Sequence, residues 1–464
     1  MRSEKRLRRR AVVPALGVVV GVAAGTATVS WSHATAGRAS VESRAVFEIT
    51  HLPHLLTAAR DQVELEYDVH CAVPGDELAE TDCDVSGTVF ARALGGDAFA
   101  EVPLERRSRD GLRQLTTPVP DALAHSTRGF EYYAVLEAAE LGERTVVPAG
   151  GAAAPHVSRP LGRVVEIDLG RHAFGRDRRS GVRIASASWG DGPTEAGLEQ
   201  GRNLAPIGAS SFDVDSRGNV LILDQAHRRV LRWQRGTKTP GRVPVSVNGT
   251  VADLAVADDG SMFVLETTAP PGTNPRVRRF DDGGRELETI EAAERAPSQI
   301  RIDEGGNPVV LGGASHHWLP VMVGGTAASP GEQLRRGRAG RRFAGAVEVV
   351  VFRHENEVRL ALVAGQIITR SWRLTSDTPL AEVQLAEPYG QRLVLVVRIY
   401  DAGDDEFAVL VLGHNGLVDR FSLDSTDWAE TAPLGRFRLA GRSLFRLGST
   451  PSQAFVDRFD LEVR

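Results

Sequence analysis

The chain has 464 residues, of which 42% are hydrophobic, 25% are charged and only 6% are aromatic. This length and apolar fraction exclude an intrinsically disordered chain and leave room for about two to four domains with cores of their own. The formal charge of −5, with no dominant basic tract, argues against a dedicated nucleic-acid-binding protein.

Residues 1–36 have the pattern of an export signal. A run of basic residues precedes the uncharged stretch 11–29, and the sequence Ala-Thr-Ala at positions 34–36 offers small side chains for cleavage. An uncleaved membrane anchor is the alternative, because the apolar stretch is nearly long enough to span a bilayer. Either way we expect the rest of the chain to be secreted or to lie in the cell envelope. Cleavage would leave a mature chain with a charge of about −10.

The two cysteines, Cys71 and Cys83, suit an exported protein. An oxidising compartment favours a disulfide between them, and a closed loop of this size stabilises the fold by about 3 kcal/mol. Two thiols are too few for a structural zinc site. A catalytic cysteine is the weaker alternative, because no neighbouring residue is placed to act as its base.

Residues 45–148 predict an antiparallel β-sandwich. Residues 62–70 alternate polar and apolar side chains, as in a half-buried strand, and residues 130–136 form another strand. This arrangement of short strands resembles immunoglobulin-like or fibronectin-III-like domains, although the Cys…Trp…Cys signature of antibody domains is absent. The Gly/Ala/Pro-rich residues that follow predict a linker over 149–160.

From residue 161 to the end, a repeated unit is the most informative feature. Copies occur at Ser211–Asp224, Asp253–Glu266 and Gln299–Leu311, and their glycines recur 42 and 46 residues apart. Each copy has an alternating strand, a turn with glycine and a more apolar returning strand. Three or four strands in each 40–50 residues predict an all-β propeller of about six blades, with five or seven as alternatives.

The first copy extends this pattern into a recognisable repeat. Residues 205–233 run from Pro-x-Gly through two strands to Arg-Val at the start of a third, and this resembles an NHL-type repeat. The second copy departs from it by an insertion at 268–274, and the third has Gly312 and Gly313 in place of the acidic residue. The resemblance implies a six-bladed, TolB- or gluconolactonase-like propeller over residues 161–464.

The geometry of such propellers brings the bends between second and third strands to one face around the axis, where a polar pocket for a ligand is expected. The candidate ligand-binding residues are Asp224, His227, Arg228, Glu266, Arg276, His316, His317 and Trp318. For Asp224 a structural role is the alternative, because an Asp at a strand end commonly accepts hydrogen bonds from turn amides.

No cofactor is predicted, but a divalent metal is possible. His316 and His317 are weak metal-ligand candidates, since adjacent residues can bind one ion only in a loop, and a surface pair is the alternative. The arginine-rich run 335–342 could bind an anionic polymer or be a solvated loop. No nucleophile elbow, phosphate loop or zinc-protease motif occurs.

The resulting hypothesis is an exported, non-enzymatic protein that binds an extracellular protein or glycan through the loop face of its propeller. Two alternatives remain open. One is a metal-dependent, lactonase-like propeller hydrolase or lyase. The other is a structural protein of the cell surface, whose only membrane contact would be an uncleaved leader.

Overall fold

The computed structural model describes residues 46–461, apart from 74–75, 81–82, 110–111, 201–204, 248–251, 268–273, 294–296, 304, 313–316, 330–332, 334–346, 365–366 and 430–435. The predicted leader 1–36, the arginine-rich run 335–342 and His316 therefore lie outside the described residues. The described elements are strands except for helix α1 (Asp121–Ala124) and 3-10 helix η1 (Gly151–Ala153). Within this part of the chain, no helix is long and apolar enough to cross a bilayer.

The N-terminal module is a sandwich of two sheets. The first sheet contains β1 (Val46–Thr50), β3 (Glu64–Val73), β8 (Leu112–Pro118) and β7 (Glu105–Arg109), with β4 (Asp76–Glu80) paired to β3. The second contains β2 (Leu56–Thr57), β11 (His156–Pro160), β9 (Phe130–Ala138), β5 (Val85–Ala93) and β6 (Ala100–Pro103), with β10 (Glu143–Val147) paired to β9. Along β9, Phe130, Tyr132 and Ala134 are buried at alternate positions and share one core cluster with Leu65 and Tyr67 of β3. The predicted sandwich is thus confirmed.

A disulfide joins Cys71 of β3 to Cys83, with a Cα–Cα distance of 6.3 Å. This pairing confirms the predicted disulfide. The closed loop includes β4 and stabilises the fold by about 3 kcal/mol in the chain-entropy model.

The segment 149–160 differs from the predicted linker. It contains η1 and β11, and β11 pairs antiparallel with β9 and parallel with β2. His156, Val157, Ser158 and Arg159 are buried in these contacts. The prediction was wrong for this part because only residues 149–155 have a linker composition, while the following residues complete a sheet of the sandwich.

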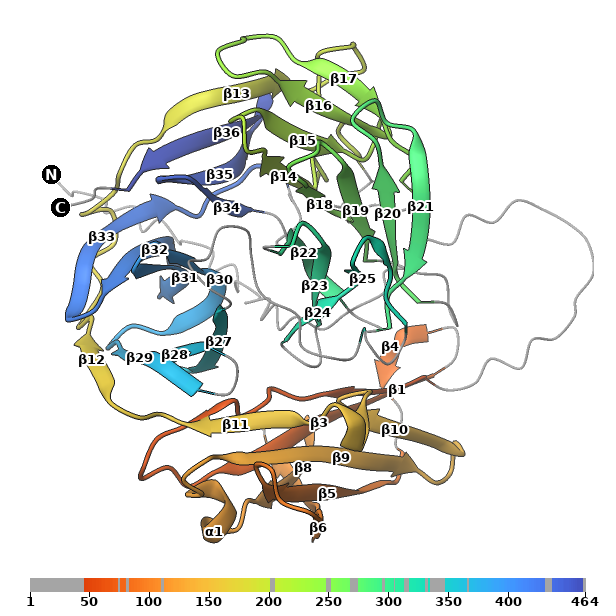
Figure 1. The fold of residues 1–464 in the computed structure, drawn as a ribbon, viewed down its shortest axis with the longest axis vertical. Helices are drawn as coiled ribbons and strands as arrows, with labels where there is room; N and C mark the ends of the chain where they lie inside the picture. Colours follow the sequence, from red (N-terminus) through yellow and green to blue (C-terminus); the bar gives the residue numbers. More distant parts are fainter. Residues whose placement is uncertain are drawn as a thin grey trace, which may run out of the picture. The chain divides into compact units, whose positions relative to one another are not determined.

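Among the described residues, the remaining strands form six sheets of three or four strands around a common axis and one two-stranded hairpin, which confirms the propeller (Figure 1). Each sheet is a blade, numbered here by the chain order of its innermost strand. Blade 1 contains β14 (Ser211–Val214), β15 (Val220–Asp224), β16 (Arg229–Trp233) and β17 (Gly241–Pro244); blade 2 contains β18 (Ala252–Val256), β19 (Met262–Glu266), β20 (Arg276–Phe280) and β21 (Glu286–Glu291); blade 3 contains β22 (Pro297–Ile302), β23 (Pro308–Gly312) and β24 (Trp318–Pro320). A short hairpin, β25 (Met322–Val323) and β26 (Thr326–Ala327), follows blade 3.

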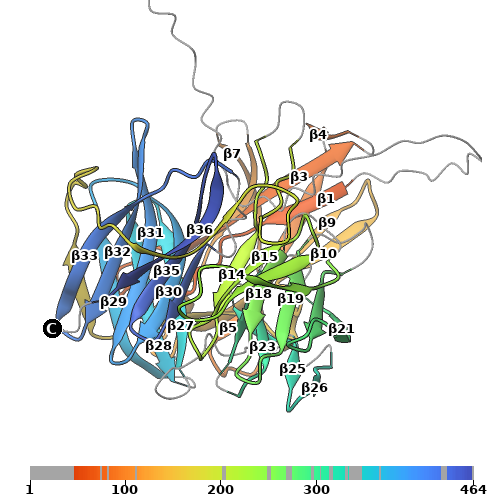
Figure 2. The same cartoon turned by 90° about the horizontal axis from the view of Figure 1, so that it is seen from above.

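The later blades have longer strands. Blade 4 contains β27 (Val347–His354), β28 (Glu357–Ala364) and β29 (Ile367–Thr375); blade 5 contains β30 (Leu380–Tyr389), β31 (Arg392–Asp401), β32 (Asp404–Gly413) and β33 (Gly416–Asp424); blade 6 contains β34 (Phe437–Ala440), β35 (Ser443–Thr450) and β36 (Gln453–Asp460). Figure 2 shows β31, β32 and β33 side by side in blade 5.

The glycines of the repeat lie in the turns between the first and second strands of blades 1 to 3. Gly218, Gly260 and Gly306 have φ values of 82°, 89° and 79°. Residues with a Cβ rarely adopt this left-handed conformation, so the repeated glycine specifies the turn, as the sequence predicts.

Two strands from the N-terminal side of the propeller complete blades at its C-terminal side. Strand β12 (Val164–Asp168) pairs parallel with β29 of blade 4, and β13 (Val182–Ser188) pairs antiparallel with β36 of blade 6. The fully buried Glu406 of blade 5 anchors the segment between them by accepting hydrogen bonds from the Gly175 backbone N–H (2.9 Å) and the His172 ring (2.8 Å). The chain thus fastens blades 4 to 6 before it enters blade 1.

The sandwich contacts blade 4 through an apolar cluster. Leu55, Leu56 and Leu161 share this cluster with Val350 and Phe352 of β27. Beside it, Arg359 of β28 is buried and donates to the Leu56 carbonyl at 3.1 Å. Arg359 also forms an ion pair with Asp61. Apolar packing and a buried charge pair therefore hold this contact together.

His54 makes the same contact sensitive to pH. Its ring packs against Phe352 at 4.6 Å, and its buried Nε2 has no hydrogen-bond partner. Burial, and then the charge of Arg359, lower the pKa of His54 to about 4. In the unfolded chain the imidazole takes up a proton near pH 6.5, so the folded state loses stability as the pH falls from 6.5 to 4, by roughly 3 kcal/mol.

Urea unfolding at pH 7 and at pH 4 measures this loss. The His54→Phe variant keeps an aromatic ring but cannot take up a proton, so we expect its free energy of unfolding to fall less over this range. An equal fall in both proteins would contradict the assignment to His54.

Candidate functional site

Asp224, the first predicted site residue, holds the bend between β15 and β16. Its buried carboxylate accepts hydrogen bonds from the Gly197 backbone N–H (3.0 Å) and Arg229 Nε (2.9 Å). The same carboxylate contacts His227 Nδ1 at 2.9 Å. These contacts give Asp224 the structural role that the sequence left open as an alternative.

His227 and Arg228 form the outer part of this bend. His227 Nε2 lies 3.1 Å from the carboxylate of Asp191, which is fully exposed. Burial lowers the pKa of His227, but hydrogen bonds to Asp224 and Asp191 outweigh it and leave the pKa raised above its ordinary value. Arg228 is exposed and has a left-handed φ of 52°. The bend therefore presents an exposed guanidinium, and its imidazole contacts the exposed carboxylate of loop 189–197.

The candidates on blades 2 and 3 have partners of their own. Glu266 is buried and forms an ion pair with Arg278 at 3.1 Å, and Arg276 pairs with Glu291 at 3.6 Å. His317 Nδ1 lies 3.0 Å from Glu348 Oε1, which connects blade 3 to β27 of blade 4.

Trp318, the remaining candidate, lies 5.8 Å from the guanidinium of Arg301, measured to the ring centroid. The described residues contain no group of three or more His, Cys, Asp or Glu side chains that could hold a metal ion. Whether His316 and His317 act together stays a prediction, because His316 lies outside these residues.

The loop 189–197 joins the two ends of the ring. The Trp189 backbone N–H donates to the Ser452 carbonyl at 3.2 Å, in the bend between β35 and β36 of blade 6. Arg229 of blade 1 donates to the Gly192 carbonyl at 3.0 Å. We call the propeller end that carries loop 189–197 and the bends 225–228 and 450–453 the bend face.

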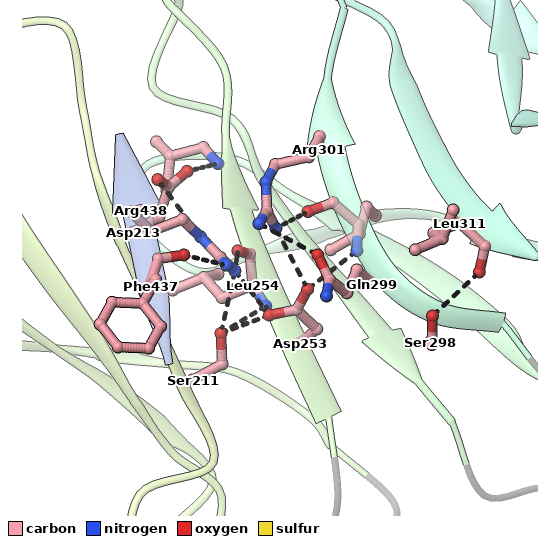
Figure 3. Close-up of polar contacts among 12 residues, drawn as sticks. Ser211, Asp213, Asp253, Leu254, Ser298, Gln299, Arg301, Leu311, Phe437 and Arg438 are labelled. Atoms are coloured by element: carbon pink, nitrogen blue, oxygen red, sulfur yellow. Dashed lines mark hydrogen bonds and ion pairs between the residues drawn. The ribbon is translucent and has the colours of Figure 1, made fainter. Parts of the chain in front are cut away.

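A different cluster, absent from the predictions, occupies the propeller axis (Figure 3). Its centre is Asp253 of β18, which is fully buried. The carboxylate accepts from Ser211 Oγ (2.5 Å), Arg438 Nη2 (2.6 Å) and the Ile300 backbone N–H (2.8 Å). These partners come from β14, β34 and β22, so one carboxylate links four blades.

Two arginines extend this cluster across the axis. Arg301 Nε donates to Glu387 Oε1 of β30 at 3.0 Å. Arg438 also donates to the Leu254 carbonyl at 3.1 Å, and its Nε lies 3.8 Å from Asp213 Oδ1. We call these side chains the axial network, and its members are Ser211, Asp213, Asp253, Arg301, Glu387 and Arg438.

The pKa values of the two arginines in the axial network are shifted in opposite directions. Burial and the nearby charge of Arg301 lower the pKa of Arg438. Burial also acts to lower the pKa of Arg301, but the charges of Glu387 and Asp253 outweigh it and raise that pKa. Both guanidinium groups stay charged at neutral pH, because the guanidinium of arginine does not deprotonate in proteins.

One small cavity of about 30 Å³ remains beside this network. Its lining residues are Asp213, Val214, Arg301, Ile302, Glu387, Arg438, Leu439 and Ala440. Three of these residues are the last residues of innermost strands, next to the first turns of blades 1, 3 and 6: Val214, Ile302 and Ala440. Because strands within a blade are antiparallel, this cavity lies at the opposite end of the ring from the bend face. Its volume suits a water molecule.

The sequence contained a signal for the axial network. Asp213, Arg301 and Arg438 each stand singly between two apolar residues of an innermost strand. A charged residue in such a position is unusual, because it must find a partner inside the protein. The predictions concentrated on the bends and did not use this signal.

Comparison with known proteins finds no matching family model and no matching curated protein. Solved structures do match over long stretches. A catalytically inactive virginiamycin B lyase from Staphylococcus aureus with quinupristin is 11% identical and covers 56% of this chain and 98% of its own, with a TM-score of 0.32. The PQQ-bound aldose sugar dehydrogenase of Streptomyces coelicolor is 12% identical, with coverages of 57% and 99% and a TM-score of 0.34.

A third match is an auxiliary nutrient binding protein from Bacteroides ovatus, which is 10% identical over 90% of this chain and 98% of its own, with a TM-score of 0.33. At such identities and TM-scores, these matches carry no argument about function. The propeller assignment rests on the strand order and the ring of six sheets.

Proposed function

We propose that this chain is an exported binding protein whose bend face binds an extracellular protein or glycan. The observation that carries the proposal is that the chain's own charged side chains fill the propeller axis. The cavity of about 30 Å³ beside the axial network is far smaller than the roughly 300–1,000 Å³ of ordinary ligand pockets. The axis therefore has no room for a larger ligand, and we place the ligand on the loops at one end of the ring.

The bend face suits this role because it combines exposed groups with a firmly held backbone. Asp191 and Arg228 are exposed there. The loop 189–197 is held by the Gly197 backbone N–H, which donates to the buried Asp224, and by Arg229, which donates to the Gly192 carbonyl. Charged groups on a rigid support can recognise a partner at a low cost in conformational entropy. The Cys71–Cys83 disulfide supports the export part of the proposal, since disulfides persist in oxidising compartments.

Co-sedimentation of the purified mature protein with bacterial cell-envelope fragments tests the proposal. We expect the wild-type protein to bind, and the charge reversal Arg228→Glu to weaken binding about tenfold or more. Arg217→Glu is the matched control, because Arg217 is an exposed arginine of the same blade in the turn at the opposite strand ends. The proposal is wrong if the fragments are not bound, or if both variants bind like wild type.

A further inference from the structure

We infer that the ligand of the bend face is a glycan and that two tryptophans, Trp189 and Trp428, stack against one of its sugar rings. This inference rests on the proposed function and names the ligand class. The two ring centroids are 6.3 Å apart, and their planes are tilted by 38°. Trp428 is 36% exposed, a large value for a tryptophan, and Trp189 is half-buried.

Trp189 is fixed in place by its own loop and by blade 6. Its indole Nε1 donates to the Thr450 carbonyl at 2.8 Å. Gly208 lies directly against the ring, since a Cβ at that position would come within 2.7 Å of it. A glycine there lets the indole lie on the backbone, and the orientation of the ring is set before any ligand binds.

Trp428 is fixed by its two neighbours, in the connection between blades 5 and 6. The buried carboxylate of Asp427 accepts from the Ser449 backbone N–H (3.0 Å) and from Arg446 Nη2 (3.3 Å). The Ala429 backbone N–H donates to Ser449 Oγ at 2.9 Å. These contacts attach both sides of the tryptophan to β35, so its exposed ring is held by the scaffold and costs little entropy to engage.

The surroundings of the pair favour a sugar over a peptide. A pyranose ring has a face of C–H groups, which stacks on an aromatic ring, and a rim of hydroxyl groups, which bonds to polar side chains. Asp191 lies two residues after Trp189, is fully exposed and contacts His227. In the described parts of loop 189–197 and of the connection between blades 5 and 6, Trp428 is the large hydrophobic side chain that is exposed. A protein-binding hot spot would typically add a surrounding layer of apolar contacts.

Binding to envelope fragments that have been treated either with periodate or with protease provides the first test. Periodate oxidises the vicinal diols of glycans, whereas protease digestion removes exposed protein. We expect periodate to abolish binding and protease to leave it intact. Binding that survives periodate but not protease would show a protein ligand and overturn the inference, while the proposed function would stand. Absence of binding to untreated fragments would overturn both.

Titration of intrinsic tryptophan fluorescence with cellohexaose, laminarihexaose and chitohexaose provides the second test. We expect at least one of them to bind, Trp428→Ala to weaken that binding about tenfold or more, and Trp428→Phe to retain most of it. Leu417→Ala is the control, because Leu417 is 39% exposed at the start of β33, at the opposite end of the ring from the bend face. The inference fails if none of the three sugars binds, or if Trp428→Ala binds as tightly as the control.

Discussion

Replacing Arg438 with alanine is expected to lower the free energy of unfolding by about 3–5 kcal/mol. The reason is that Asp253 is fully buried and would lose its strongest counter-charge, the guanidinium 2.6 Å away. Such a charge cannot be rehydrated at the centre of a closed ring. Urea unfolding followed by tryptophan fluorescence measures the change.

Arg183→Ala is the matched control for this experiment. Arg183 forms an ion pair with Asp457 at 2.9 Å, but its side chain is 40% exposed, so its removal should cost no more than about 1 kcal/mol. If Arg438→Ala costs as little as this control, the axial network does not stabilise the ring as described.

A double variant keeps the prediction testable if the single variant fails to fold. Adding Asp253→Asn to Arg438→Ala removes the carboxylate charge that the first change leaves unpaired. We expect the two changes to be non-additive, by about 0.5–3 kcal/mol in favour of the double variant. Strict additivity would contradict a direct interaction between the two residues.

Replacing Arg359 with alanine should weaken the contact between the sandwich and blade 4, with a loss of about 3–5 kcal/mol in the free energy of unfolding. Arg359 is buried, donates to the Leu56 carbonyl, and has Asp61 and Glu357 as ion-pair partners. Its removal leaves two carboxylates close together without the cation that separates them. Differential scanning calorimetry should then show the sandwich unfolding at a lower temperature than the propeller.

Arg373 offers a matched control on the neighbouring strand β29. It also forms an ion pair with Glu357, at 2.8 Å, but its side chain is 37% exposed. None of its described contacts is with the sandwich. Arg373→Ala should therefore cost less and leave the two modules unfolding together. An unchanged single transition in Arg359→Ala would show that the apolar cluster alone couples the modules.

Several elements of the fold were predictable because their signals are local. Gly218, Gly260 and Gly306 mark tight turns that need a left-handed residue, and the strands on either side follow from alternating polarity. The Cys71–Cys83 disulfide followed from the presence of two cysteines, 12 residues apart, in a chain expected to be exported. For these features, the residues that determine the structure are only a few positions apart in the chain.

The closure of the ring was not predictable in the same way. Val164 of β12 pairs with Ser371, and Ser186 of β13 pairs with Phe455. The residues of a strand do not specify which sheet edge it will pair with when that edge lies more than 200 residues away in the sequence. The linker prediction at 149–160 was wrong for a related reason, because β11 acquires its structure by pairing with β9 and β2.

For the candidate site, the sequence placed Asp224 and Glu266 at the bends after second strands but did not show which partners their side chains have. Asp224 and Glu266 form ion pairs with arginines of their own blades. Whether either carboxylate can contact a ligand depends on these neighbours, which only the folded ring brings together. The contact of Trp189 with Trp428 required blade 6 to meet the loop that precedes blade 1.

The amino-acid sequence by itself determined an all-β chain with a sandwich, repeated blades and a disulfide loop, because turn conformation and strand polarity depend on neighbouring residues. Only the tertiary structure decided which charged residues meet at the axis. Ser211, Asp253, Arg301 and Arg438 come from four blades, and their partnership exists only after the ring has closed. Because these groups are buried, the stability of each charge depends on its partners in the other blades, and no local sequence pattern could specify those partners.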